Sequence, residues 1–144
     1  MPQRIFLFIF SLIIFFSPSG GQCAGETPEQ LVRDFYLWYF EADARAPAYL
    51  DDGIYKYVAP ETVKHIREHS ESSDEYYVTK ANSWTAAWKD VKITVGTAAS
   101  MADAGFIVPV SFQAGYADFH VVVFMKEENG VLLITKITDI YPYS

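Results

Sequence analysis

Residues 105–125 have the sequence GFIVPVSFQAGYADFHVVVFM, and this stretch decides the fold of the chain. Hydrophobic side chains recur there at every second position, first over Phe106 to Phe112 and again over Phe119 to Met125. A period of two is typical of a strand with one buried face. The stretch therefore predicts two neighbouring strands joined by a short connection.

The same alternation continues on both sides of this stretch. Val91, Ile93 and Val95 precede it, and Val131 to Ile140 follows a Glu128-Asn129-Gly130 turn of the kind that closes hairpins. Four strands joined by short connections predict an antiparallel meander. Pro109 has no N–H to donate, so we expect it at a sheet edge or at a bulge.

The residues before the strands have helical spacing. Thr27-Pro28-Glu29-Gln30 can form a capping box, and an apolar face follows it until Pro47 ends the helix. A second helix is expected from Pro60 to about Glu71, and a short helical turn over 83–88. The prediction is an α+β fold, with helices packed on one face of a curved four-stranded antiparallel sheet.

The last two strands are hydrophobic on both faces. Val122 and Phe124 are expected on the second face of one strand, and Leu132 and Ile134 on that of the next. A second hydrophobic face must be covered by the chain, by a ligand or by another subunit. A homodimer through the sheet is one prediction from this pattern.

Residues 1–24 have the features of a signal peptide. Arg4 precedes the apolar run Ile5 to Phe16, which is too short to span a membrane and is followed by small residues. Cleavage after Cys23 or Ala24 would leave residues 25–144 as a single domain, periplasmic or secreted and without a membrane span. The alternatives are an uncleaved anchor and a lipid on Cys23.

The charge of the chain excludes some partners. All eighteen acidic residues but only ten of the eleven lysines and arginines follow residue 25, so the mature domain carries about −8. No basic stripe is present for nucleic acid, and a basic partner is favoured. No glycine-rich phosphate loop, Ser-His-Asp order or cysteine metal motif occurs, so no cofactor is predicted.

Four segments carry a resemblance to a known family: PEQLVRDFYLWY at 28–39, YVAP at 57–60, DEYYVTKA at 74–81, and Trp88. Together they resemble the bacterial proteins grouped as domain of unknown function 3828. These are exported or lipid-anchored envelope proteins, related in fold to nuclear transport factor 2. The resemblance implies a cone-shaped molecule with a pocket at its open end, and it implies no chemistry.

Three groups of side chains are candidate sites. The first is a set of aromatic residues that combine apolar bulk with a polar tip, as binding pockets do, or that simply fill the core. Its members are Tyr36, Tyr39, Tyr76, Tyr77, Trp84 and Trp88. The second is an acid–base pair of Asp34 and His120 inside the cone. Alternatively, Asp34 interacts favourably with the N-terminus of the first helix, and His120 is a packed or solvated residue of a strand.

The third candidate is the run His65-Ile66-Arg67-Glu68-His69. Histidines four residues apart on a helix can share one Zn²⁺, with Glu68 polarising a water and Asp74 or Glu75 as third ligand. A solvated surface helix has the same pattern.

Besides a zinc peptidase that uses His65, Glu68 and His69, two classes of function remain open from the sequence. The first is a non-enzymatic envelope protein that binds a protein or a small ligand, including an immunity-type inhibitor of a toxic effector in the periplasm. The alternative is a small hydrolase or isomerase that uses Asp34 and His120.

Overall fold

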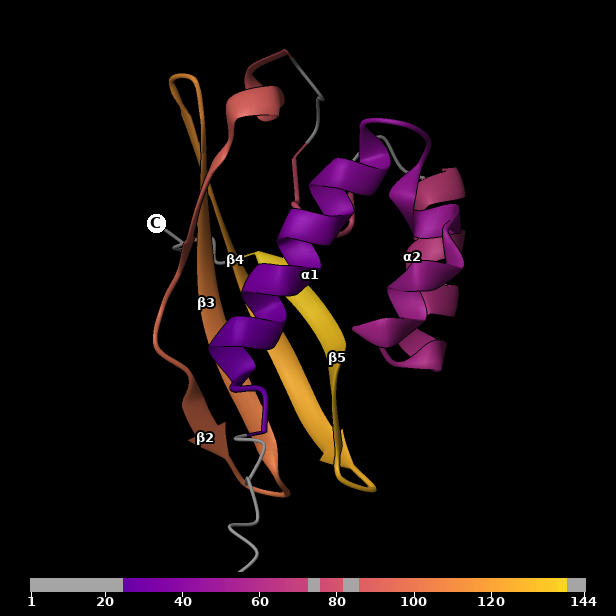
Figure 1. Cartoon of the computed structure of the whole chain (residues 1–144), viewed down its shortest axis with the longest axis vertical. Coiled ribbons are helices and arrows are strands. Elements are labelled where there is room, and N and C mark those ends of the chain that lie inside the picture. The colour runs from indigo at the N-terminus through magenta and orange to yellow at the C-terminus, as the bar shows by residue number, and fades with distance from the viewer. Residues whose placement is uncertain (1–24, 73–75, 82–85, 140–144) are drawn as a thin grey trace, which may run out of the picture.

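The computed structural model describes residues 25–72, 76–81 and 86–139. The predicted signal peptide, with its possible lipid site at Cys23, therefore lies outside the described residues. In the described part, two helices cover one face of a five-stranded antiparallel sheet (Figure 1). None of the helices in that part has the length and hydrophobicity that a membrane crossing needs.

The elements follow one another as helices first and strands afterwards, which confirms the predicted α+β class. The helical elements are α1 (Pro28–Asp43), η1 (Ala48–Leu50), η2 (Asp52–Lys56), α2 (Pro60–Ser72) and η3 (Ala86–Asp90). The strands are β1 (Lys92–Val95), β2 (Ala99–Met101), β3 (Gly105–Ala114), β4 (Ala117–Glu128) and β5 (Val131–Asp139).

Helix α1 begins with the predicted capping box. The Gln30 N–H donates to the Thr27 hydroxyl oxygen at 3.2 Å, and the Thr27 N–H donates to the Gln30 side-chain oxygen at 3.1 Å. These bonds satisfy two donors that a helix N-terminus otherwise leaves unpaired. The helix ends at Asp43, a few residues before Pro47.

The sheet has the order β1-β3-β4-β5, so the four predicted strands do form a meander. The fifth strand, β2, was not predicted, because Ala99–Met101 has no hydrophobic alternation and is exposed. It pairs with β3 beyond the end of β1. Pro109 lies on β3 opposite this break, where its carbonyl accepts the Gly96 N–H at 2.8 Å. A proline is tolerated in this interior strand because the neighbouring edge is interrupted there.

The core lies between the helices and the inner face of the sheet. Helix α1 packs across β1 and β3, and α2 packs against β5. The segment Tyr57–Ala59 also pairs with β5, through the Ile134 N–H to the Tyr57 carbonyl and the Ala59 N–H to the Ile134 carbonyl. The buried hydrophobic residues of the strands are Val108, Val110, Phe112, Ala114, Val121, Val123, Met125, Ile134 and Ile137.

The two faces of β5 differ from the prediction. Ile134 is fully buried in the core and Leu132 packs against it, so neither lies on the outer face. The cause is a bulge: Phe124 pairs with Lys136 and Met125 with Ile134, which leaves Thr135 as an extra residue. An extra residue exchanges the faces of the positions beyond it. Val122 and Phe124 do lie half-buried on the other face, and the homodimer stays a prediction.

Candidate functional site

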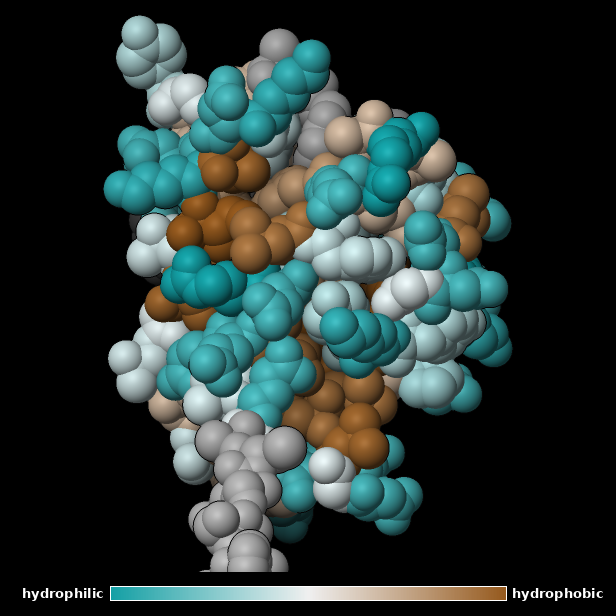
Figure 2. Space-filling view, in the orientation of Figure 1, coloured by the Kyte–Doolittle hydropathy of each residue, from teal (hydrophilic) through white to brown (hydrophobic). Residues whose placement is uncertain are grey.

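A groove runs between α1 and the segment that leads into β1. It has a volume of about 540 Å³. Its lining consists of Leu37, Phe40, Glu41, Asp43, Ala44, Trp88, Lys89, Val91 and Ile93. In Figure 2 a hydrophobic patch occupies this region between η3 and α1, with hydrophilic residues around it. The groove is therefore an apolar depression with a charged rim.

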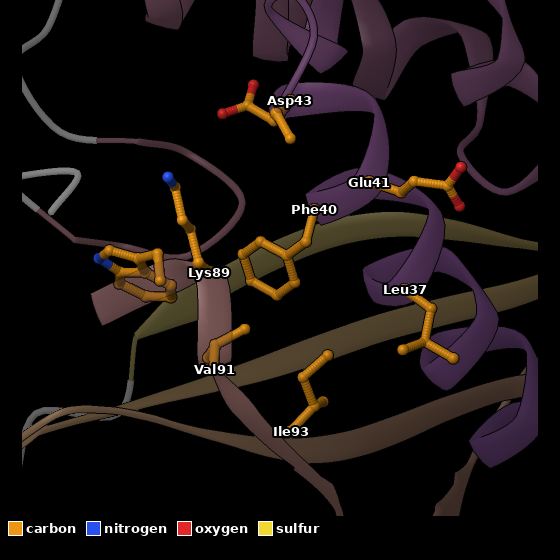
Figure 3. Close-up of a pocket in the computed structure, with 9 residues that line it drawn as sticks. Leu37, Phe40, Glu41, Asp43, Lys89, Val91 and Ile93 are labelled. Carbon is orange, nitrogen blue, oxygen red and sulfur yellow. The ribbon is translucent and has the colours of Figure 1, made fainter. Parts of the chain in front are cut away.

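The local sequence explains why these residues share one groove. Leu37 and Phe40 of α1 and its C-cap residue Ala44 are three and four residues apart, which places them on one side of the helix. Val91 and Ile93 are two apart, so they point to the same side of the extended chain. Figure 3 shows Phe40 projecting from α1 toward Val91 and Ile93, with Leu37 farther along the helix.

The base of the groove is held by stacked aromatic rings. Trp88, which is almost fully buried, stacks on Phe119 with centroids 5.2 Å apart and lies 5.7 Å from Phe40. Phe40 in turn meets Phe112 edge-on at 5.8 Å. Such ring pairs add stabilisation beyond the area that they bury. The base is consequently preformed rather than assembled by a ligand.

Charged groups occur on the rim of the groove. Glu41 and Asp43 come from α1, and Lys89 comes from η3. A carboxylate oxygen of Asp43 accepts the Ala48 N–H at 2.9 Å, which fixes that side chain. Glu41 forms an exposed ion pair with Arg45 at 3.8 Å. Burial raises the pKa of the neighbouring Tyr39, and the charge of Asp43 adds to this increase.

The predicted aromatic set does not form one surface. Tyr36 is fully buried, and its hydroxyl donates to the Val78 carbonyl at 3.0 Å. Tyr39 is buried beside it, so both belong to the core, as the alternative interpretation had it. Trp88 lines the groove, whereas Tyr76 and Tyr77 belong to the 76–81 segment. Trp84 lies outside the described residues.

The structure does not bring Asp34 and His120 together. Asp34 lies on the exposed side of α1, and the expectation of an acid buried in a cavity is wrong for it. His120 is exposed on β4, one residue from Val121, which faces the core. Its Nδ1 atom lies 2.9 Å from the Ser111 hydroxyl oxygen across the strand pair. The histidine thus points away from the helices, on the opposite face of the sheet.

The two histidines of α2 share an aromatic neighbour. The Tyr77 ring lies edge-on to His65 at 5.4 Å and to His69 at 5.5 Å, and the Lys80 ammonium sits 4.2 Å from its centroid. Within the described ranges no three potential metal ligands come together. Asp74 and Glu75, the expected third ligands, are outside those ranges.

Sequence reasoning did not single out three hydrophobic residues that the structure places in or near the groove or in solvent. Leu37 and Phe40 lie on the groove side of α1, next to the core positions that the helical spacing identified. Tyr116 is fully exposed in the turn between β3 and β4. Its only sequence signal is its position next to Gly115 between two predicted strands.

Comparison with known proteins gives one informative likeness. No family model and no curated protein matches the chain, so the resemblance to domain of unknown function 3828 stays an expectation. Among solved structures, the chain is similar to the immunity protein Tai3 in the type VI native effector-immunity complex Tae3-Tai3 from Ralstonia pickettii. The identity is 28% and the TM-score 0.66, over 83% of this chain and 99% of that one. The fold is thus shared with a type VI effector immunity protein along almost its whole length.

Proposed function

We propose that this protein is an immunity-type inhibitor that binds and neutralises an effector of a type VI system. The observation that carries the proposal is the likeness to Tai3, which covers nearly all of that chain and includes sequence identity as well as fold. The strongly acidic composition supports a protein partner of basic character. The preformed groove between α1 and β1 supplies an apolar surface of the kind that protein partners bury.

The test is protection against the effector. Candidate effectors are Tae3 and proteins similar to Tae3 from the organism that makes this chain. Each is produced in bacterial cells with an export signal, with or without the full-length chain, and survival is counted. We expect one of these effectors to kill cells and the chain to restore growth.

A binding measurement supports the survival test. The purified domain, residues 25–144, is mixed with the effector, and the complex is followed by size exclusion and calorimetry. Failure of the chain to bind any of these effectors, or to protect cells from them, would refute the proposed function.

We propose that the protein acts in the periplasm after removal of residues 1–24. The apolar run and small residues of that segment support export. The test fuses residues 1–24 to a reporter enzyme that is active only outside the cytosol, with Ile9→Lys as the matched control that interrupts the apolar run. Mass spectrometry of the full-length protein from a periplasmic extract should find a chain that begins at Ala24 or Gly25. An intact Met1 in that fraction would contradict the cleavage.

A further inference from the structure

The connection between β3 and β4 presents an aromatic side chain entirely to solvent. Tyr116 is the most exposed large hydrophobic residue in the described part of the chain. It follows Gly115, whose positive φ of 64° makes the turn tight. Figure 1 shows this hairpin extending past the ends of both helices, next to η3. A tyrosine in such a place contributes nothing to the core, whereas tyrosine is common among residues that dominate binding energy.

The hairpin tip packs against η3, the element that contributes Trp88 and Lys89 to the groove. A Cβ atom placed on Gly115 would lie 3.4 Å from the Cβ of Ala87, so the turn packs against η3. Ala87 directly precedes Trp88 and Lys89, which line the groove. The apolar base of the groove and Tyr116 therefore lie on neighbouring parts of one end of the molecule.

This combined surface is rigid and apolar. Trp88 is held by its stack on Phe119 and by Phe40, while Leu37 on the far side of the groove is 55% exposed. A preformed surface loses little conformational entropy when a partner binds. An exposed leucine beside buried rings offers the partner further apolar area at the same place.

The charges around the surface indicate the chemistry of the partner. The rim carries Glu41 and Asp43 against Lys89, and Arg45 pairs with Glu41. Asp118, two residues after Tyr116, brings the local count to three carboxylates and two cations. The adjacent Asp90 and Lys92 cancel each other. With a net charge of −7 over the whole chain, the field at this end attracts a basic segment.

We infer that the groove and Tyr116 together form the surface that binds the effector. The effector segment seated there presents a hydrophobic side chain to the groove, flanked by lysine or arginine facing Glu41 and Asp43. Tyr116 anchors the other side of the contact in a recess of the effector. The inference rests on the proposed function, because it names where the same partner binds.

The experiment compares two surface variants with two matched controls. Tyr116→Ala removes the anchor, and Leu37→Arg places a bulky cation at the groove. Tyr55→Ala removes another exposed tyrosine, and Val131→Arg alters a residue of similar exposure (53%, against 55% for Leu37) at the start of β5. Circular dichroism and urea unfolding verify that each variant folds, and calorimetry with the purified Tae3-like effector measures the dissociation constant.

The outcomes separate the two proposals. We expect Tyr116→Ala to weaken binding about 30-fold and Leu37→Arg about tenfold or more, with both controls within about threefold of the wild type. Equal binding by the wild type and by both surface variants would overturn the inference while leaving the proposed function intact. Absence of binding by the wild type would overturn the proposed function and the inference with it.

Discussion

At the scale of single residues, the Tyr36 hydroxyl is the clearest test of the core. Its bond to the Val78 carbonyl joins α1 to the 76–81 segment, and the tyrosine is completely buried. Tyr36→Phe leaves that carbonyl without its partner, so we expect the free energy of unfolding to fall by about 1–2 kcal/mol. Urea denaturation measures this change. Tyr116→Phe is the matched control, because its hydroxyl is exposed, and an equal effect of both substitutions would contradict the prediction.

The buried phenols also predict a loss of stability in base. Burial raises the pKa of Tyr36 and of Tyr39. A tyrosine in the unfolded chain, in contrast, has a pKa of about 10. Below that pH both states hold the proton and the stabilisation is complete. As the pH rises above about 10, the unfolded chain releases protons that the folded chain retains, so stability decreases.

The measurement is the urea midpoint between about pH 9 and about pH 11. The wild-type midpoint should fall over this range, and the double variant Tyr36→Phe/Tyr39→Phe should show a shallower fall. Parallel curves for the two proteins would show that these phenols are not responsible.

The residue scale also shows where sequence reasoning ends. Helical spacing correctly predicted an apolar face on α1, and that face buries Phe35 and Tyr39. The spacing could not distinguish residues of the core from residues that line a groove, because both are apolar and recur at the same spacing. Tyr36 was accordingly proposed for binding although it is core, and Leu37, which borders the groove, was overlooked.

At the scale of elements, the alternating pattern located the long strands but did not show which face of each strand is buried. Period two identifies a strand whichever face it buries, and both faces of β4 and β5 are hydrophobic. The extra residue at Thr135 then decides which β5 side chains meet the helices. No residue type at that position marks a bulge, so only the paired strands reveal it.

The break between β1 and β2 gives a prediction at this scale. A Cβ atom on Gly96 would lie 2.6 Å from Cγ of Pro109, whose ring cannot move away easily. Gly96→Ala should therefore lower the free energy of unfolding by about 1–3 kcal/mol, as overpacking does. Gly25→Ala is the control, since a Cβ there meets nothing within 4 Å.

A double variant tests the cause of this destabilisation. In Gly96→Ala/Pro109→Ala the clash is absent, so its loss of stability should be smaller than the sum of the two single losses, as urea unfolding would show. Strict additivity would mean that the alanine is unfavourable for another reason, such as its backbone conformation.

At the scale of the whole molecule, the order of helices and strands was enough to predict the α+β class, whereas the sequence left a binding protein and a small enzyme both open. The likeness to an immunity protein favours the binding protein. The position of the proposed binding surface could not be predicted, because the groove joins residues of α1 to Trp88 and Val91, and its hairpin neighbour comes from still later in the chain. Such a surface exists only once the helix lies across the sheet.

The net charge leads to a kinetic prediction about the complex. An acidic domain and a basic effector segment associate faster than two uncharged partners, because their charges attract each other before contact. This attraction reaches over one Debye length, which is about 10 Å at 0.1 M salt. Raising the salt concentration from about 0.05 to about 0.5 M should lower the association rate constant about tenfold or more, with a smaller change in the dissociation rate. Stopped-flow tryptophan fluorescence, to which Trp88 at the base of the groove contributes, can follow both rates.

Glu41→Gln should reduce the salt dependence of association, whereas Glu68→Gln on α2 should alter it less, because that carboxylate lies on a different helix. An association rate that does not change with salt would show that apolar contact, rather than charge, brings the effector to the groove.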